Sequence, residues 1–144
     1  MTQTRADFSF FHRLRVRYSE IDAQAIVYNS HYVTYYDLVI TEYLRALDFD
    51  YSIATTQAAG KDFHTVRVVV EYRAPARYDD VLDVGICAGR VGRSSIMWQM
   101  AIFREGEEES LNTGEVVWVY TDQQTHKSTP LPEELVVKLQ DDSK

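Results

Sequence analysis

The chain has 144 residues, the length of one domain, and we expect a single domain over residues 1–144. Hydrophobic residues make up 45% of it and charged residues 26%, a balance that excludes extensive disorder. Its 22 acidic residues outnumber its 15 basic ones, and the formal charge of −7 argues against nucleic acid as the main partner.

Alternation of side chains predicts a first strand at residues 8–18. The even positions are apolar or aromatic apart from His12, whereas Arg13, Arg15 and Arg17 occupy odd positions. Because successive side chains of a strand point to opposite faces, this pattern is typical of a strand with one wet face.

One long helix is predicted over residues 29–49. Apolar side chains recur every three or four positions and fall on one helical face, which a second apolar line widens. The polar side chains form only a narrow stripe, so we expect a helix that is mostly wrapped by protein. The three sets are Tyr32, Tyr36, Val39, Tyr43 and Leu47; Val33, Ile40 and Leu44; and Thr34, Asp37, Thr41, Arg45 and Asp48.

The predicted start of this helix suggests a site. The side chains of Asn29 and Ser30 can each accept a hydrogen bond from the unpaired amides of a first turn. Asp22 stands seven positions before Asn29, so a loop could bring its carboxylate beside those amides. Amides attract developing negative charge while a carboxylate handles a proton or a water, which makes the pair a catalytic candidate. The plain alternatives are a turn aspartate and a capping asparagine.

Four further strands follow a short connection at residues 51–62, for which about one helical turn is expected. Apolar runs place these strands at residues 64–74, 82–89, 95–104 and 111–121. Short polar links between the runs predict antiparallel neighbours. The chain then enters a short helix, predicted over residues 131–139, through a proline followed by acidic residues.

This order of elements predicts an α+β fold, with a curved antiparallel sheet of about five strands wrapped around one long central helix. One small sheet cannot cover a helix that is apolar over most of its circumference. We therefore expect the chain to self-associate, as a dimer or a tetramer.

Several short motifs occur in a characteristic order. They are RYSEID at residues 17–22, AIVYNSHY at 25–32, YYD at 35–37, YRAPARYDD at 72–80, GRSS at 92–95 and PLP at 130–132. Together they resemble hotdog-fold acyl-CoA thioesterases of the 4-hydroxybenzoyl-CoA thioesterase-like family, over nearly the whole chain. The resemblance implies a hotdog fold and hydrolysis of an acyl-CoA substrate to a free acid and CoA, without a cofactor.

The resemblance also implies roles for two residues. It makes Asp22 the catalytic carboxylate, as a base acting on water or as a nucleophile, and it makes the Asn29 amide the group that polarises the thioester carbonyl. The family usually has glycine where Ala25 stands, and alanine would strain the loop if the position requires a positive φ. Some hotdog thioesterases place the carboxylate on the helix instead, where Asp37 and Glu42 stand here.

Five residues are candidates for substrate binding. The resemblance maps Arg93 and Ser94 onto residues that meet the phosphates of CoA, although a solvated arginine would look the same in sequence. Tyr28 and Tyr32 could line an acyl pocket or belong to the core. His31 could orient substrate or water, or could pack at a subunit seam.

Other chemistries lack support in the sequence. The four histidines are scattered without ligand spacing, and the single Cys87 permits neither an intrachain disulfide nor a multi-cysteine zinc site. We therefore predict no metal. Residues 1–10 lack the apolar core of a secretion signal, and no apolar run approaches the ~20 residues that span a bilayer. We expect a cytoplasmic protein without a membrane partner.

Three other functions remain open from the sequence alone. The chain could act on acyl groups held by an acyl-carrier protein, it could be a hotdog hydratase, or it could bind acyl-CoA without catalysis. The alanine at position 25 favours the non-catalytic alternative.

Overall fold

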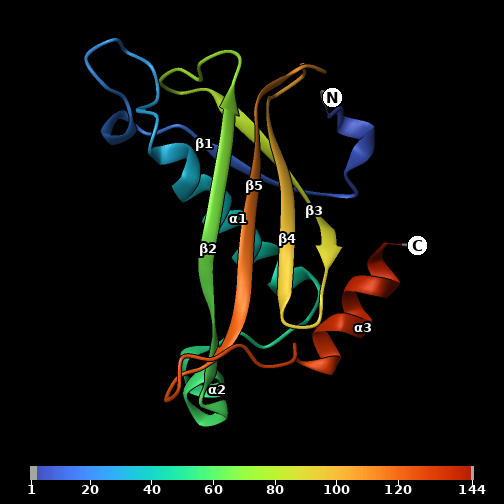
Figure 1. Cartoon of the computed structure of the whole chain (residues 1–144). Helices are drawn as coiled ribbons and strands as arrows, with labels where there is room; N and C mark the ends of the chain where they lie inside the picture. The colour runs from blue at the N-terminus through green and yellow to red at the C-terminus, as the bar shows by residue number, and fades with distance from the viewer. Residues whose placement is uncertain (1–2, 144) are drawn as a thin grey trace.

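The computed structural model describes residues 3–143; residues 1–2 and 144, which the single-domain prediction includes, lie outside the described residues. The chain runs through a short 3-10 helix, a strand, a second 3-10 helix, two α-helices, four strands and a last helix (Figure 1). Their bounds are η1 (Arg5–Asp7), β1 (Phe10–Arg15), η2 (Tyr18–Glu20), α1 (His31–Ala46), α2 (Ile53–Ala59), β2 (Lys61–Tyr72), β3 (Val81–Val91), β4 (Ser95–Arg104), β5 (Ser110–Asp122) and α3 (Glu133–Asp142).

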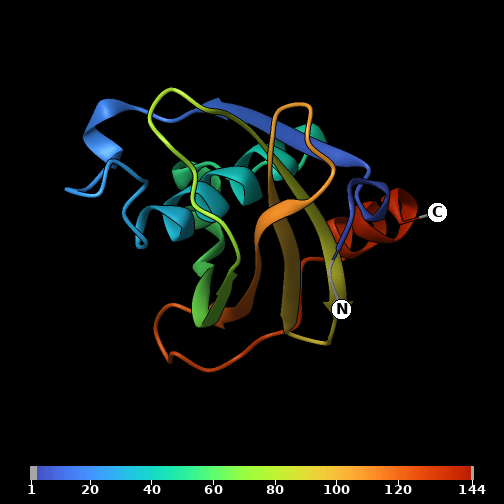
Figure 2. The same cartoon turned by 90° about the horizontal axis from the view of Figure 1, so that it is seen from above.

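The five strands form one antiparallel sheet in the order β1-β3-β4-β5-β2. The sheet curves around α1, which lies in its hollow (Figure 2). The predicted α+β architecture, a curved sheet around one long helix with a short C-terminal helix, is confirmed. Within residues 3–143, no helix is both long and apolar enough to cross a membrane.

α1 buries one face and leaves the opposite face open. Val33 was predicted to widen the buried face, but it is 36% exposed, and Leu38 is 40% exposed. One sheet covers only one side of the helix, as expected, so coverage of Val33 by a second copy stays a prediction. The buried side chains of α1 are Tyr32, Tyr35, Tyr36, Val39, Ile40, Tyr43 and Leu44.

The segment between α1 and β2 contains more helix than predicted. α2 has seven residues, and α1 is shorter at both ends than the predicted range 29–49. The Ser52 hydroxyl accepts a hydrogen bond from the Thr55 amide at 3.2 Å, which caps the start of α2. Gly60 ends α2 in the left-handed conformation, which glycine adopts without strain.

A close contact between α1 and β5 fixes the depth of the helix in the sheet. A Cβ added at Gly114 would stand 2.4 Å from a ring carbon of Tyr36, so only glycine fits there. The Tyr36 hydroxyl donates a hydrogen bond to the side chain of Asn112, which is also fully buried. The helix is thereby held against the sheet one turn below its N-terminal end.

Candidate active site

The Asp22 loop, residues 21–28, is a small hairpin that is held at its base. Ile21 and Val27 form an antiparallel bridge. The Asp22 amide donates a hydrogen bond to the Ile26 carbonyl across the hairpin at 2.9 Å. The Val27 amide donates to the Ala76 carbonyl at 2.9 Å, so the connection between β2 and β3 supports the loop from one side. The hairpin therefore holds Asp22 at a defined place relative to the start of α1.

Glu20, which the sequence patterns did not single out, joins this loop to α1. Its buried carboxylate accepts hydrogen bonds from the Arg17 amide at 2.8 Å and the Tyr35 hydroxyl at 2.9 Å, and its carbonyl accepts the Tyr28 amide at 2.9 Å. Burial alone would raise the pKa of Glu20, but the hydrogen bonds from Arg17 and Tyr35 outweigh burial and lower the pKa. Burial is the main reason that the pKa of Tyr35 is raised, and the hydrogen bond to Glu20 is the second. The buried pair is therefore a carboxylate and a neutral phenol.

Asp22 lies at the edge of a cleft and is half-buried. One of its carboxylate oxygens, Oδ1, accepts a hydrogen bond from the Gln24 amide at 2.8 Å. Asp22 and Asn29 both line this cleft of about 280 Å³, together with Tyr32 and Tyr72. The carboxylate is thus oriented by the main chain and faces the same cleft as the start of α1.

Ala25 adopts the left-handed conformation, with φ of 61°. The expected strain of alanine at a positive φ is therefore present, and it amounts to about 1–2 kcal/mol, because the Cβ crowds the following carbonyl. The Ala25 amide donates to the Asp22 carbonyl at 2.9 Å, which closes the tight turn in which this conformation occurs.

The first turn of α1 has no side-chain cap. Ser30 occupies the N-cap position, but its side chain makes no cap hydrogen bond, so the expected capping by Asn29 or Ser30 is wrong. Among the described residues, 3–143, the amides of these two residues donate to no acceptor. Unpaired amides at a helix N-terminus attract an anion or a polarised carbonyl oxygen.

Three of the predicted binding residues also lie at this end of the helix. Tyr28 is 48% exposed and packs edge-on against His31, with ring centroids 6.1 Å apart. Tyr32 is buried, which raises its pKa, and its ring meets that of Tyr72 edge-on. Tyr72, which the sequence did not single out, donates from its hydroxyl to the Asn29 carbonyl at 3.1 Å.

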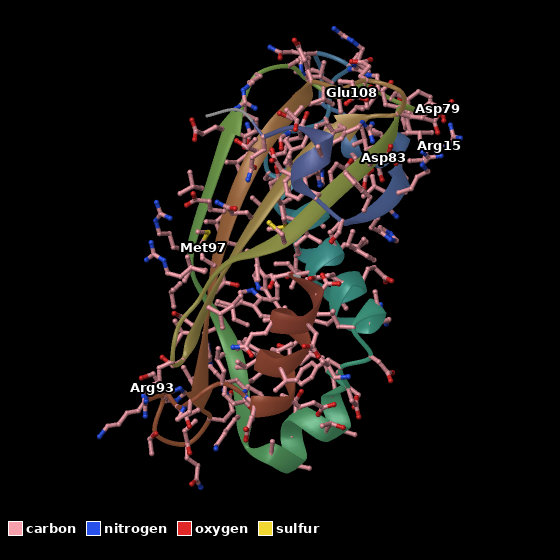
Figure 3. The ribbon with its side chains drawn as sticks, turned by 90° about the vertical axis from the view of Figure 1, so that its right-hand side faces the viewer. Arg15, Asp79, Asp83, Arg93, Met97 and Glu108 are labelled. Carbon is pink, nitrogen blue, oxygen red and sulfur yellow. The ribbon has the colours of Figure 1, made fainter. Side chains whose placement is uncertain are left out.

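Arg93 and Ser94 lie at the other end of the sheet. The Ser94 carbonyl accepts the Tyr120 amide at 2.8 Å, and Tyr120 pairs with Phe63 near the start of β2. Tyr72 stands at the other end of β2, where the cleft lies. At ~3.3 Å per residue, it is about 30 Å from Phe63. Figure 3 shows Arg93 at this far end. One chain by itself therefore does not bring Arg93 and Ser94 to the cleft.

The two helix carboxylates lie away from the cleft. Asp37 is exposed, and its carbonyl accepts the Thr41 hydroxyl at 3.3 Å. Glu42 forms an ion pair with Arg45 at 2.5 Å, one turn along the same helix. In the part of the chain that the structure describes, no three His, Cys, Asp or Glu side chains gather as a metal site. Asp22 is thus the carboxylate that this cleft presents.

Known proteins share this fold and this stretch of sequence. A family model described as the thioesterase-like superfamily matches residues 16–139. The acyl-CoA thioester hydrolase YbgC of Escherichia coli O6:H1 is 31% identical to this chain over 125 residues, which cover 87% of this chain and 91% of YbgC. The acyl-CoA thioesterase YbgC of Haemophilus influenzae is 29% identical over 100 residues, 68% of this chain and 71% of that protein.

A solved structure carries the same architecture. The 1,4-dihydroxy-2-naphthoyl-CoA thioesterase Slr0204 from Synechocystis matches with a TM-score of 0.86 at 17% identity, covering 94% of this chain and 98% of that one. The structural match shows a hotdog fold, and the family model and the YbgC relatives indicate a thioester hydrolase. The chain belongs to the thioesterase-like superfamily.

Replacing Ala25 by glycine is expected to stabilise the protein. Glycine removes the crowding at a positive φ but adds freedom to the unfolded chain, and the balance is a gain of about 0.5–1 kcal/mol in the free energy of unfolding. Urea unfolding measures this gain. The matched control is Ala23→Gly in the same loop, which has no positive φ to relieve and should lose stability. Equal losses in both variants would contradict the strain at position 25.

Replacing Glu20 by glutamine is expected to lower stability in a pH-dependent way. The folded-state pKa of Glu20 lies below its ordinary value of 4.5, so its stabilising effect is complete above that pH and is lost as the pH falls through the folded-state value. The free energy of unfolding of Glu20→Gln should lie about 1–2 kcal/mol below wild type at pH 7, and the difference should shrink below pH ~4.5.

Urea unfolding between pH 7 and pH 3 checks this, with Glu134→Gln as the control. Glu134 is exposed and forms a helical ion pair with Lys138 at 3.9 Å, so its loss should cost less than about 0.5 kcal/mol. A deficit for Glu20→Gln that stays constant with pH would rule out the ionised carboxylate as the stabilising form.

Proposed function

We propose that this protein is an acyl-CoA thioesterase in which Asp22 and the Asn29 amide carry the reaction. The observation that carries the proposal is their place in one cleft: half-buried Asp22 and Asn29 both line it, and the Asn29 amide, just before α1, donates to no acceptor among the described residues. The YbgC relatives, named as acyl-CoA thioester hydrolases, support CoA as the carrier of the acyl group. The products are then a free carboxylic acid and CoA.

Two routes use these groups. In the first, Asp22 takes a proton from water, the resulting hydroxyl attacks the thioester carbonyl, and CoA leaves as its thiolate. In the second, Asp22 attacks the carbonyl itself and expels the thiolate, and water then hydrolyses the mixed anhydride. The Asn29 amide donates to the oxygen on which negative charge develops in either route. Because the Gln24 amide already occupies Oδ1, the other carboxylate oxygen, Oδ2, would act.

Self-association through β2 is part of the proposal. β2 lies at the edge of the sheet and presents a row of main-chain groups that can pair with another strand. Its Val66 is 60% exposed and Val68 is 39% exposed, and the open face of α1 adds Val33 and Leu38. A twofold axis would pair two copies of β2 in antiparallel fashion and cover these apolar side chains.

This pairing would also complete the substrate site. An antiparallel pair sets the Phe63 end of one β2 beside the Tyr72 end of the other. Arg93 and Ser94 of the second copy would then approach the cleft that they cannot reach within their own chain. The predicted CoA-binding residues and the predicted catalytic pair would therefore meet across the subunit interface. Location in the cytoplasm stays a prediction.

Replacing Asp22 by asparagine is expected to lower kcat at least about 100-fold, because it removes the base or nucleophile while keeping the side-chain shape. Thiol release from short, long and aromatic acyl-CoAs measures it, with Asp37→Asn as the control that should keep full activity. Single turnover in H₂¹⁸O separates the routes, since only a nucleophilic Asp22 acquires the label. Equal thiol release by wild type and Asp22→Asn would overturn the mechanism, and tight acyl-CoA binding without turnover would indicate a binding protein.

Mixed dimers test the shared site. Asp22→Asn and Arg93→Glu should each be inactive at low acyl-CoA concentration, the second because charge reversal repels the CoA phosphates. A mixed dimer isolated through two different affinity tags has one intact site, with Asp22 from one copy and Arg93 from the other. It should show about half of the wild-type rate per dimer. A mixed dimer as inactive as its parents would contradict a site shared between copies.

A further inference from the structure

Tyr72 joins the edge strand to the first turn of α1. It is the last residue of β2, where its main chain pairs with Asn112 of β5. From there its hydroxyl donates to the Asn29 carbonyl at 3.1 Å, and its ring packs edge-on against buried Tyr32 with centroids 5.6 Å apart. The two elements lie side by side at the upper end of the sheet (Figure 1). A side chain rooted in the sheet thus reaches the turn that carries the free amides.

The solvent exposure of Tyr72 indicates that its role is not packing in the core. The residue is 54% exposed, whereas Tyr32 and Tyr36 on the facing helix are 3% and 0% exposed. A half-exposed tyrosine adds little to the core through its ring. Its hydroxyl nevertheless makes a hydrogen bond to the main chain of a residue far away in sequence, at the edge of the cleft.

The bond acts on the peptide unit that follows Asn29. The Asn29 carbonyl and the Ser30 amide belong to one planar unit, so a donor on the carbonyl fixes the orientation of the amide as well. A hydrogen bond to the carbonyl also polarises the unit and makes the Ser30 N–H a stronger donor. The Asn29 amide belongs to the preceding peptide unit, which meets this unit at the Asn29 Cα.

A second contact holds the other side of this turn. The Tyr32 hydroxyl accepts the Ala76 amide at 3.0 Å, and the Ala76 carbonyl accepts the Val27 amide at 2.9 Å. The segment just before Asn29 is therefore fixed through Ala76, and the segment just after it through Tyr72. Since Ser30 supplies no cap of its own, the hydroxyl of Tyr72 does the orienting from outside the helix.

We infer that Tyr72 is a positioning residue that aims the amides of Asn29 and Ser30 at the substrate carbonyl. The inference rests on the proposed thioesterase function and extends it. The hydroxyl of Tyr72 is engaged by the main chain, so it acts through the amides and makes no bond to the reacting atoms. Its effect belongs to the transition state, where the carbonyl oxygen carries negative charge.

Tyr72→Phe tests this, because phenylalanine keeps the ring against Tyr32 and removes only the hydroxyl. The matched control is Tyr78→Phe, since Tyr78 is 53% exposed and packs edge-on against Tyr18. With an acyl-CoA that wild type hydrolyses, kcat of Tyr72→Phe should fall about three- to tenfold at an unchanged KM. Tyr78→Phe should match wild type in both constants and in Tm.

A second measurement does not need turnover. In a ¹H–¹⁵N correlation spectrum, the amide signals of Asn29 and Ser30 should shift in Tyr72→Phe and stay in place in Tyr78→Phe. An unchanged kcat, a raised KM at unchanged kcat, or unshifted signals would each overturn the positioning role. If wild type releases thiol from none of the acyl-CoAs, the proposed function fails, and the spectrum still decides whether Tyr72 orients the turn.

Discussion

The unpaired amides at the start of α1 are the constraint on which the rest of this structure depends. A helix end needs partners for its first amides, and here no side chain of the helix supplies one. The close contact of Tyr36 with Gly114 fixes α1 against the sheet. The N-terminal end of the helix therefore has a fixed position. It opens into the cleft lined by Asp22. A stable fold and a site that attracts negative charge thus come from the same arrangement.

The loop that brings Asp22 to this end is strained and firmly held. Ala25 costs about 1–2 kcal/mol in its left-handed conformation. The Glu20 carboxylate offsets such a cost, because it is buried, ionised and bonded to both Arg17 and Tyr35. An anion buried with several donors orders the main chain around it. The position of Asp22 is consequently set by residues outside the cleft.

The sequence predicted the parts of this structure that depend on periodicity. Spacing of three and four found α1, and alternation or apolar runs found the five strands, because each pattern follows from the geometry of its own element. The exposure of Val33 could not be found that way, since it depends on which side of the helix the sheet covers. Glu20 and Tyr72 were missed for a similar reason: their partners are Tyr35 and Asn29, which only the folded chain brings near.

The sequence likewise predicted one part of the candidate site and missed another. The motif order placed Asp22 and Asn29 together at one helix end, because the loop between them is too short to separate them far. The resemblance mapped Arg93 onto the CoA site by motif alone and gave no distance, and the folded sheet places Arg93 about 30 Å from the cleft end of β2. That distance is what makes a second copy of the chain part of the proposed site.

Isotope-edited infrared spectroscopy tests the central claim most directly, that the Asn29 and Ser30 amides at the start of α1 polarise the carbonyl of a bound thioester. An acyl-CoA with ¹³C at its thioester carbonyl would be bound to Asp22→Asn, which should hold it without rapid hydrolysis. If the amides donate to this carbonyl, its stretching band lies at a lower frequency than for the same acyl-CoA free in buffer. A bound carbonyl that absorbs at or above the free frequency would contradict the account.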